Sequence, residues 1–192
     1  MTDKIALFDM DGTIADYDSA MKTSLARLGN EEIPQDLHVD NLPPWLEARM
    51  GLIKSQRGWW KSLPVIKSGL NLMQLCADMG FNIHVLTQGP KRSKHAWAEK
   101  YEWCEEFVAP ICEDYGISVT RSGKGLHYGR VFVDDYPPYM QEWLKHRPRG
   151  LGLMPTLETN KSFSYPQVYK YNPSNWKTEE LIEKLKLAYD RN

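Results

Sequence analysis

Three clusters of acidic and hydroxyl side chains could do chemistry in this chain of 192 residues. Each cluster directly follows a short apolar run, and the three are Asp9-Met10-Asp11-Gly12, Thr87-Gln88-Gly89 and Asp134-Asp135. Carboxylate and hydroxyl oxygens are hard ligands of the kind that Mg²⁺ prefers. Carboxylates can also serve as nucleophiles or as general acids and bases. These clusters are therefore the first candidates for an active site.

Several other site motifs do not fit the sequence. A calcium-binding EF-hand loop that began at Asp9 would need a glycine sixth and a glutamate twelfth, but the glycine is fourth and Ala20 is twelfth. Ser118–Lys124 ends like a P-loop but has a serine in place of the first glycine. The five histidines form no H-E-x-x-H motif and no close pair. The three cysteines lack C-x-x-C spacing, which indicates neither a disulfide framework nor a zinc site and suits a reducing cytoplasm.

Composition narrows the classes of partner. Lysine and arginine total 24 against 25 aspartates and glutamates, so the formal net charge is -1. Such a balance argues against electrostatic binding of a nucleic acid polymer or an anionic membrane over the whole surface, but it allows the binding of a small anionic ligand. The apolar run Ile5–Phe8 is far too short for a signal sequence or a membrane helix. We therefore expect a cytoplasmic protein that acts on a small molecule, and a homodimer stays open.

The elements that must position the clusters follow from hydrophobic patterning. The apolar runs Ile5–Phe8, Ile83–Leu86 and Val131–Val133 predict buried parallel strands. Helical patterns occupy about 66–79, 91–107, 138–146 and 175–190. Alternating strands and helices predict a doubly wound α/β sheet, in which the carboxyl ends of the strands meet at one crevice. Leu151–Met154 is a candidate further strand, and Pro155–Pro166 has the pattern of a loop.

The first crossover is unusually long. Asp11 and Thr87 lie 76 residues apart, whereas a βαβ unit takes roughly 30 or more. The helix near 66–79 already supplies the crossover, so residues 16–63 are surplus. We predict that they form a small, mostly helical cap inserted after the first strand, while residues 1–15 and 64–192 form the core.

Together the clusters resemble the motifs of the haloacid dehalogenase superfamily of phosphotransferases. Its first motif, D-x-D-G-T/V after strand one, is matched by Asp9–Thr13, and its second, a hydroxyl residue closing a strand, by Thr87. Its fourth motif, an acidic pair, is matched by Asp134-Asp135. For the third, a lysine, we prefer Lys124, which precedes Asp135 by 11 residues. The resemblance implies a Rossmann-like three-layer α/β/α core that carries the cap.

Within that superfamily the chain is most similar to the 5'(3')-deoxyribonucleotidases. The stretches that carry the likeness are Asp9–Gly12, Lys94–Tyr101, Thr120-Arg121 with nearby Lys124, Val133–Asp135 and Asn175–Lys177. The chain departs from the family's pattern in three ways: Gln88 replaces a serine after Thr87, Tyr136 replaces an arginine or lysine after the acidic pair, and the cap is shorter. These departures leave the chemistry intact and bear on the substrate.

The resemblance implies roles for the acidic residues. Asp9 would attack phosphorus to form an aspartyl-phosphate, while Asp11 would protonate the leaving oxygen and then activate water. Asp9, the backbone carbonyl of Asp11 and Asp135 would ligate Mg²⁺. Asp134 would lie beside them as an orienting residue or a water-mediated ligand.

The resemblance also implies how the substrate is held. Thr87 would hydrogen-bond the phosphoryl oxygens, Gln88 would contact the substrate, and Lys94 would join Lys124 as a second cation for the phosphate. Aromatic residues of the predicted cap either pack inside it or stack on a base, a contact worth roughly 1–3 kcal/mol. The candidates are Tyr17, Trp45 and Trp60, and Tyr17 is favoured because it follows the first motif closely.

The sequence thus predicts a Mg²⁺-dependent phosphomonoesterase that hydrolyses deoxyribonucleoside monophosphates. One alternative keeps the fold and the chemistry, with a sugar phosphate or another small phosphometabolite as substrate. A second alternative is a catalytically idle binding module on the same fold, against which the intact pair Asp9 and Asp11 argues.

Overall fold

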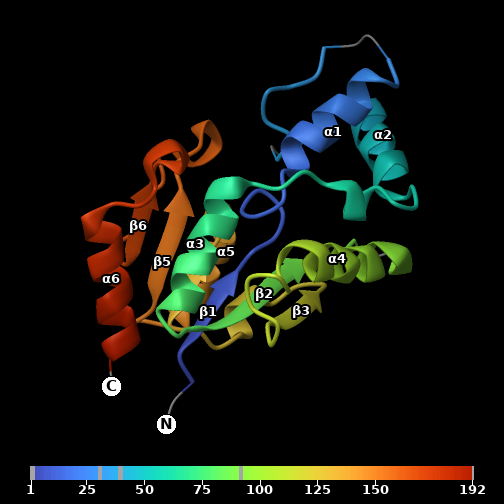
Figure 1. Cartoon of the computed structure of the whole chain (residues 1–192). Coiled ribbons are helices and arrows are strands. Elements are labelled where there is room, and N and C mark those ends of the chain that lie inside the picture. The colour runs from blue at the N-terminus through green and yellow to red at the C-terminus, as the bar shows by residue number, and fades with distance from the viewer. Residues whose placement is uncertain (1–2, 30–31, 39–40, 91–92, 192) are drawn as a thin grey trace.

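The computed structural model describes residues 3–29, 32–38, 41–90 and 93–191. Its strands and helices are β1 (Ile5–Phe8), α1 (Tyr17–Ala26), α2 (Pro44–Lys54), α3 (Lys67–Asp78), β2 (Asn82–Gln88), α4 (Lys94–Phe107), β3 (Gly116–Thr120), β4 (Val131–Val133), α5 (Pro137–Lys145), β5 (Leu151–Pro155), β6 (Val168–Tyr171) and α6 (Glu179–Asp190). Short 3₁₀ turns cover Trp60–Ser62, Lys124–Leu126, Glu158–Asn160 and Pro173–Asn175. Figure 1 shows this course from the N-terminal to the C-terminal end.

The six strands form one parallel sheet in the order β3-β2-β1-β4-β5-β6. From β1 the chain adds β2 and then β3 on one side of the sheet. It then returns to the other side of β1, where it adds β4, β5 and β6 in turn. The direction in which strands are added therefore reverses between β1 and β4. Phe8 at the end of β1 pairs with Val85 of β2 and Val133 of β4. The carboxyl ends of these strands, and the polar clusters that follow them, therefore lie side by side, as expected at a topological switch point.

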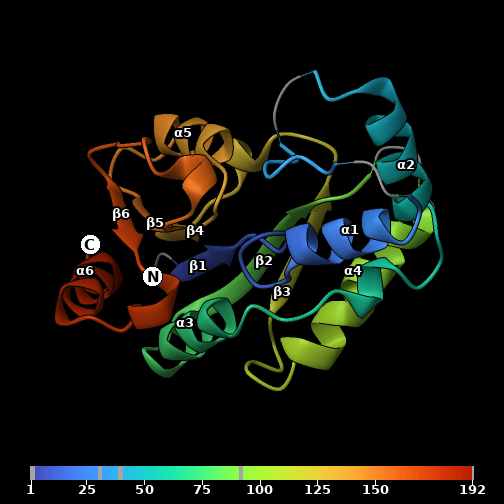
Figure 2. The ribbon, with the colours of Figure 1, turned by 90° about the horizontal axis from the view of Figure 1, so that it is seen from above.

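Helices cover both faces of the sheet. In Figures 1 and 2, α3, α4 and α6 lie on one face and α5 lies on the other. On the first face, apolar helix residues such as Leu72 and Leu185 belong to one buried cluster with the sheet residues Phe8 and Val133. A smaller cluster joins the other face to α5, and its members are Leu7, Leu86, Phe132, Met140, Trp143, Leu144 and Met154. The predicted three-layer α/β/α fold is confirmed.

Two helices begin later than the patterns predict. Helix α6 starts at Glu179, because the Thr178 side chain accepts a hydrogen bond from the Leu181 backbone N–H at 3.2 Å and caps the helix. The segment before it holds only the 3₁₀ turn Pro173–Asn175. Helix α4 starts at Lys94, and residues 91–92 of the predicted helix lie outside the described part.

The sequence patterns missed two strands, β3 and β6, which are the edges of the sheet. Every residue of β3 is half-buried, and so are most of β6. An edge strand pairs on one side only and has a partly exposed surface, so it does not need the continuous apolar run that marks a central strand. The candidate strand Leu151–Met154 is confirmed as β5, which ends at Pro155.

The surplus segment 16–63 contains α1, α2 and the turn Trp60–Ser62. In Figure 1 it lies beyond the carboxyl end of β1. Its buried side chains, among them Met21 and Leu46, belong to the same continuous apolar cluster as the sheet residues Phe8 and Val85. The limits of a separate cap domain at 16 and 63 therefore stay a prediction.

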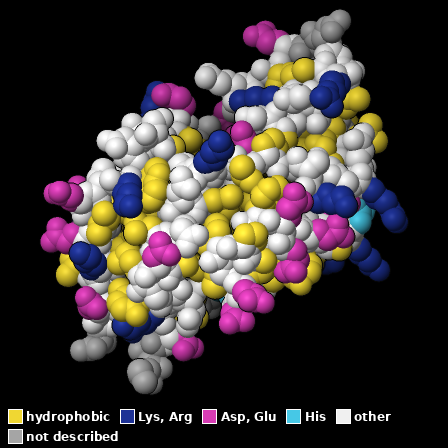
Figure 3. Space-filling view, in the orientation of Figure 1, with side chains coloured by type: hydrophobic (Ala, Val, Ile, Leu, Met, Phe, Trp, Pro, Cys, Tyr) yellow, Lys and Arg dark blue, Asp and Glu magenta, His cyan; other side chains and the backbone are white. Residues whose placement is uncertain are grey.

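The surface agrees with the near-neutral composition. Acidic and basic side chains are interspersed over the face shown in Figure 3. Within the described ranges, each helix is too short or too polar to cross a lipid bilayer.

Candidate active site

The loop after β1 is a tight turn that aims two carboxylates into the crevice. The backbone N–H groups of Ile14 and Ala15 donate to the carbonyl of Met10 at 3.0 and 2.8 Å. Gly12 adopts a left-handed φ of +80°, and a Cβ there would lie 2.4 Å from Asp135 Oδ2. Only glycine combines this backbone conformation with the close approach of Asp135. Gly12 therefore allows the loop after β1 to pack closely against Asp135 at the end of β4.

Three carboxylates meet at this junction. Asp9, Asp134 and Asp135 each offer one oxygen, and these oxygens lie within 4.8 Å of one another. Asp9 and Asp134 are buried, and Asp135 is half-buried. Asp11 Oδ1 is also buried and has no hydrogen-bond partner in the described part of the chain. A compact set of hard anionic oxygens with an unsatisfied carboxylate beside it fits a divalent cation such as Mg²⁺.

Burial disfavours the ionised form of these carboxylates. It raises the pKa of Asp9, although Lys124 opposes the shift, and it raises the pKa of Asp134 well above the ordinary value. Burial, reinforced by the charge of Asp9, raises the pKa of Asp135 to about 7. Nearby positive charge is what allows such a group to ionise.

Lys124 supplies part of that charge, as its sequence position predicts. It lies on the 3₁₀ turn before β4, is almost fully buried, and places Nζ 2.5 Å from Asp9 Oδ1 and 3.0 Å from Asp134 Oδ2. Burial alone would lower its pKa, but the charges of Asp134 and Asp9 outweigh burial and raise it. Lys124 therefore stays a cation between two carboxylates.

A second lysine, Lys100 on α4, was missed as a site residue. Its buried Nζ donates to Asp11 Oδ2 at 2.6 Å and to Thr87 Oγ1 at 2.9 Å. Lys94, the lysine chosen from the sequence, lies at the start of α4 and lines a separate cavity of about 180 Å³ with Arg121. The structure thus places Lys100 at the crevice and leaves Lys94 outside it.

The helical period could have identified Lys100. Ala96, Lys100, Trp103 and Cys104 are all buried, and their spacing puts them on one face of the helix. A lysine within an apolar stripe needs a buried partner. Lys94 is six residues earlier and faces a different direction.

A pocket of about 370 Å³ opens over the carboxylates. It is lined by Asp9, Asp11, Tyr17, His38, Lys54, Trp60, Gln88, Gly89, Pro90, Lys124, Asp135, Tyr136 and Tyr139. Thr87 and Asp134 lie behind this lining, each fully buried. Trp45 does not line the pocket: the residue is 38% exposed, and its ring lies 5.1 Å from the Arg49 guanidinium. Of the three cap aromatics named from the sequence, only Tyr17 and Trp60 border the pocket.

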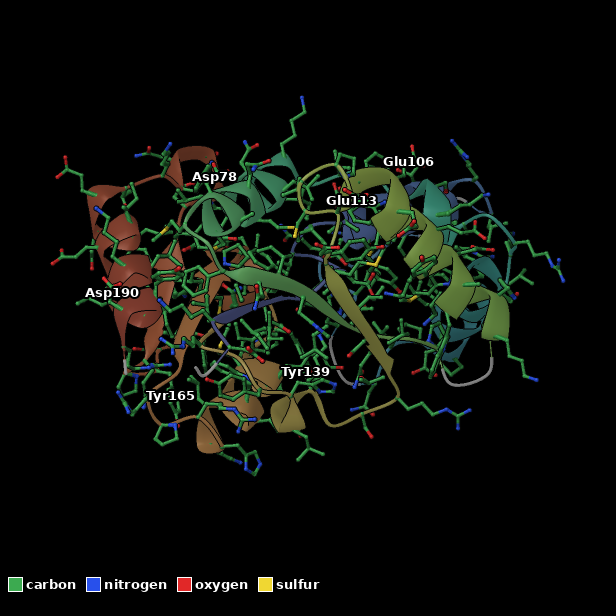
Figure 4. All side chains as sticks on the ribbon, turned by 60° about the horizontal axis from the view of Figure 1, so that its bottom comes forward. Asp78, Glu106, Glu113, Tyr139, Tyr165 and Asp190 are labelled. Atoms are coloured by element: carbon green, nitrogen blue, oxygen red, sulfur yellow. The ribbon has the colours of Figure 1, made fainter. Side chains whose placement is uncertain are left out.

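Aromatic rings form much of the pocket wall. Tyr17 and Trp60 are stacked, with centroids 5.8 Å apart at 29°. Both are largely buried, at 8% and 3% exposed. On the opposite side Tyr139, labelled on α5 in Figure 4, donates its hydroxyl hydrogen to Gln88 Oε1 and packs against Tyr136 at 4.9 Å. The wall thus combines segments from both sides of the crevice.

Two further basic residues at the pocket, His38 and Lys54, were not anticipated. The hydrogen bond from His38 Nε2 to Asp18 Oδ1, at 2.9 Å, raises the pKa of the imidazole, as does the negative charge of Asp18. Lys54 ends α2, where the Trp60 indole N–H donates to its backbone carbonyl at 3.0 Å. Both residues come from the segment 16–63, whose fold alone brings them to the site.

Two buried polar residues hold the pocket together. Glu99 on α4 accepts hydrogen bonds from the backbone N–H groups of Gly58 and Trp60, at 2.7 and 3.1 Å. Asn160 donates to the backbone carbonyls of Asp135 and Pro155, both at 2.9 Å. Glu99 therefore fixes Trp60 to the core, and Asn160 fixes the loop that carries Asp135.

No protein-family model matches the chain, and no curated protein matches its sequence. Solved structures do match its fold. A haloacid dehalogenase-like family hydrolase from Xanthomonas campestris has a TM-score of 0.57 at 13% identity, over 99% of each chain. A protein described as a haloacid dehalogenase-like hydrolase, from Burkholderia xenovorans, has a TM-score of 0.56 at 15% identity, over 96% of each chain.

A third similar structure is a HAD family hydrolase from Deinococcus radiodurans, solved with bound phosphate and sodium. Its TM-score is 0.51 at 11% identity, and the match covers 95% of this chain and 88% of that one. Sequence identities this low are evidence for a shared fold alone. Together with the parallel sheet and its strand order, they show that the chain has the fold of haloacid dehalogenase-like hydrolases.

Proposed function

We propose that the protein is a Mg²⁺-dependent phosphomonoesterase. The observation that carries the proposal is the convergence of Asp9 and Asp11 with two buried lysines, Lys124 and Lys100, at the switch point of the sheet. A carboxylate can attack a phosphate dianion only where positive charge offsets their repulsion. The phosphate bound by the similarly folded Deinococcus hydrolase supports the same class of ligand.

The residues that would hold Mg²⁺ are Asp9, Asp135 and the backbone carbonyl of Asp11, with Asp134 as an orienting residue. When bound there, the ion supplies positive charge that draws a phosphoryl group toward the carboxylates. Two lysines and one divalent cation balance the four carboxylates of the site when all are ionised. The dianionic substrate then faces two further basic residues, Lys54 and His38, at the pocket.

The chain's own groups can carry both halves of the reaction. Asp9 forms a bond to phosphorus as the bond from phosphorus to the leaving oxygen breaks, and protonated Asp11 donates its proton to that oxygen. Asp11 then takes a proton from the water that attacks phosphorus, which frees Asp9 and releases phosphate. Lys100 holds Asp11 through Oδ2 and Thr87 through its hydroxyl, so the acid–base residue and the phosphate-binding residue share one support.

For the substrate we propose a deoxyribonucleoside monophosphate. The pocket of about 370 Å³ suits one small molecule, and its lining includes Tyr136 and Tyr139, whose rings could contact a base, next to Tyr17 and Trp60. A specific observation favours the alternative, a sugar phosphate: Tyr17 and Trp60 stack on each other and leave little ring face exposed.

A phosphate-release assay over nucleoside monophosphates and sugar phosphates tests the function and ranks these substrates. Activity should vanish in EDTA and return with Mg²⁺, while Ca²⁺, which takes a larger and looser shell, should restore little. Asp9→Asn should keep the fold and lose at least ~10³-fold in turnover, because an amide cannot form the acyl-phosphate.

Activity of Asp9→Asn within about tenfold of the wild type would remove Asp9 as the nucleophile. Full activity in chelator would reject the role of the cation. If the wild type releases no phosphate from p-nitrophenyl phosphate in the presence of Mg²⁺, the idle binding module becomes the better description.

A further inference from the structure

Lys54 differs from the other basic residues that line the pocket over the carboxylates. Lys124 is paired with two carboxylates, and His38 is paired with Asp18. Lys54 Nζ has neither a hydrogen bond nor an ion pair with any residue in the described ranges. The reaction steps proposed above do not use this amine, so its donors are available to a ligand.

The Lys54 amine is accessible from the pocket. Among the described residues, the side-chain nitrogens that are buried without a partner are His127 Nδ1 and Arg147 Nε. Lys54 Nζ is not one of them, and the residue as a whole is half-buried. Because Lys54 lines the pocket, a molecule bound there can reach its amine.

The backbone at Lys54 is fixed by the core. Lys54 is the last residue of α2, and its carbonyl accepts a hydrogen bond from the Trp60 indole N–H at 3.0 Å. The Trp60 backbone N–H in turn donates to Glu99 on α4 at 3.1 Å. The residue before Lys54, Ile53, is fully packed in the apolar cluster. The side chain therefore enters the pocket from a fixed backbone position.

Lys54 lies at the leaving-group end of the site. Burial lowers its pKa, and the charges that oppose this shift are those of Asp11 and then Glu47. The proposed metal ligands Asp9 and Asp135 are not among the opposing charges. In the proposed mechanism Asp11 protonates the leaving oxygen, so the leaving group must lie beside Asp11. A leaving group in that place is the part of the substrate nearest to Lys54.

An amine at this position favours an anionic acceptor. In the proposed mechanism the phosphoryl group is held at the other end of the site, by Lys124, Thr87 and the divalent cation. A half-buried amine without a partner gains most from a ligand that brings negative charge, because the anion stabilises the ammonium form and accepts its hydrogen bonds.

We propose that Lys54 is a specificity-determining residue that binds a second anionic group, a carboxylate or a further phosphate, on the leaving group of the substrate. The inference rests on the proposed phosphomonoesterase function and narrows its substrate class. Among nucleotides and among sugar phosphates, it selects the members that carry such a group.

Two pairs of substrates test the proposal on the full chain, and the members of each pair differ in one anionic group. The pairs are deoxythymidine 5'-monophosphate with deoxythymidine 3',5'-bisphosphate, and glucose 6-phosphate with 6-phosphogluconate. In at least one pair the wild type should have a kcat/KM about tenfold or more higher for the more anionic member, as expected for one charge-assisted contact. The pair that shows this preference identifies the second group as phosphate or as carboxylate.

Lys54→Met should remove the preference. Its kcat/KM should fall about tenfold more for the anionic member than for its partner, mainly through KM, because the contact is made equally in the ground state and the transition state. Lys61→Met is the matched control: Lys61 belongs to the same segment, is exposed, pairs with Glu102 and does not line the pocket. This control should change the preference less than about twofold.

Two results would overturn the proposal: a wild type that prefers neither anionic member, or equal losses in Lys54→Met on both members of the preferred pair. Equal losses would assign Lys54 to the shared phosphate or to packing. Melting temperatures are measured for each variant, and Lys54→Gln repeats the test if Lys54→Met is unstable. Turnover of p-nitrophenyl phosphate by the wild type with Mg²⁺ separates the two failures. If it persists, only the role of Lys54 is rejected, whereas no phosphate release from any substrate rejects the proposed function and this role with it.

Discussion

Lys100 Nζ on α4 lies 2.6 Å from Asp11 Oδ2 in the loop after β1, although the two residues are 89 positions apart in the chain. The lysine is fully buried, and the same nitrogen donates to Thr87. A buried lysine of this kind fixes the orientation of the general acid–base residue that the proposed mechanism needs. It also links the first and second polar clusters of the sequence through one cation.

Lys100→Met should therefore lower kcat/KM by about 10²–10³-fold, in the range seen when one stabilising donor is removed from an active site. The methionine keeps most of the side-chain volume, so the melting temperature should change little. Lys94→Met is the matched control, since Lys94 lies outside the pocket, and it should retain activity within about twofold. Steady-state kinetics with a phosphomonoester check both, and equal losses in the two variants would contradict the assignment.

Gly12→Ala should damage the metal site. The new Cβ would require a left-handed φ of +80° and would lie 2.4 Å from Asp135 Oδ2, so the carboxylate must move. We expect Mg²⁺ affinity to fall at least tenfold by calorimetry, with a lower melting temperature. Gly51→Ala, in the last turn of α2 with nothing within 4 Å, should instead raise stability by about 0.5–1 kcal/mol. Unchanged Mg²⁺ affinity in Gly12→Ala would show that Asp135 is not a ligand.

Tyr17→Ala tests whether the stacked ring contacts the substrate. If Tyr17 touches the nucleoside, the Michaelis constant for a deoxynucleotide should rise several-fold, while p-nitrophenyl phosphate, which does not fill the pocket, should change less. Tyr17→Phe keeps the ring and should retain most of the affinity. Because Tyr17 packs on Trp59 and Trp60, the melting temperature of each variant is measured as well. Equal losses on both substrates with a lower melting temperature would assign Tyr17 to packing alone.

His38→Gln should lower stability in a pH-dependent way. The pKa of His38 is raised from 6.5 in the folded protein, so its contribution is complete below about pH 6.5 and disappears as the pH rises through the raised pKa. For Asp18, burial raises the pKa, but the hydrogen bond and charge of His38 outweigh it, so the net shift is downward from 3.8. The contribution of Asp18 is complete above about pH 3.8 and disappears as the pH falls through the lowered pKa.

The pair therefore stabilises the fold most between these limits. Both side chains are more than a third exposed, so the effect should stay below about 1 kcal/mol. Thermal melts of the wild type and His38→Gln should differ by about 2 °C near pH 5.5 and by less than about 1 °C near pH 9. A difference that stays constant across this range would exclude the ion pair as its source.

The sequence by itself determined the fold and the acidic centre of the site. Three short apolar runs predicted central strands of a parallel sheet, and a polar cluster directly after each run then lies at the carboxyl end of its strand. This local rule predicted that Asp9, Asp11 and Asp135 lie together, and the resemblance to the superfamily's motifs, with the 11-residue spacing to Asp135, pointed to Lys124, which lies beside Asp9.

Only the tertiary structure decided the rest of the pocket. The edge strands β3 and β6 lack a continuous apolar run because one side of each is open. The helical period of α4 could have marked Lys100 as a buried lysine, but only the packing of α4 on the sheet showed that its partners are Asp11 and Thr87. His38 and Lys54 reach the pocket through the path of the segment 16–63, which depends on long-range contacts such as that of Glu99 with the Trp60 backbone. Contacts between residues so far apart in sequence leave no periodic trace in either segment, so the sequence patterns could not reveal them.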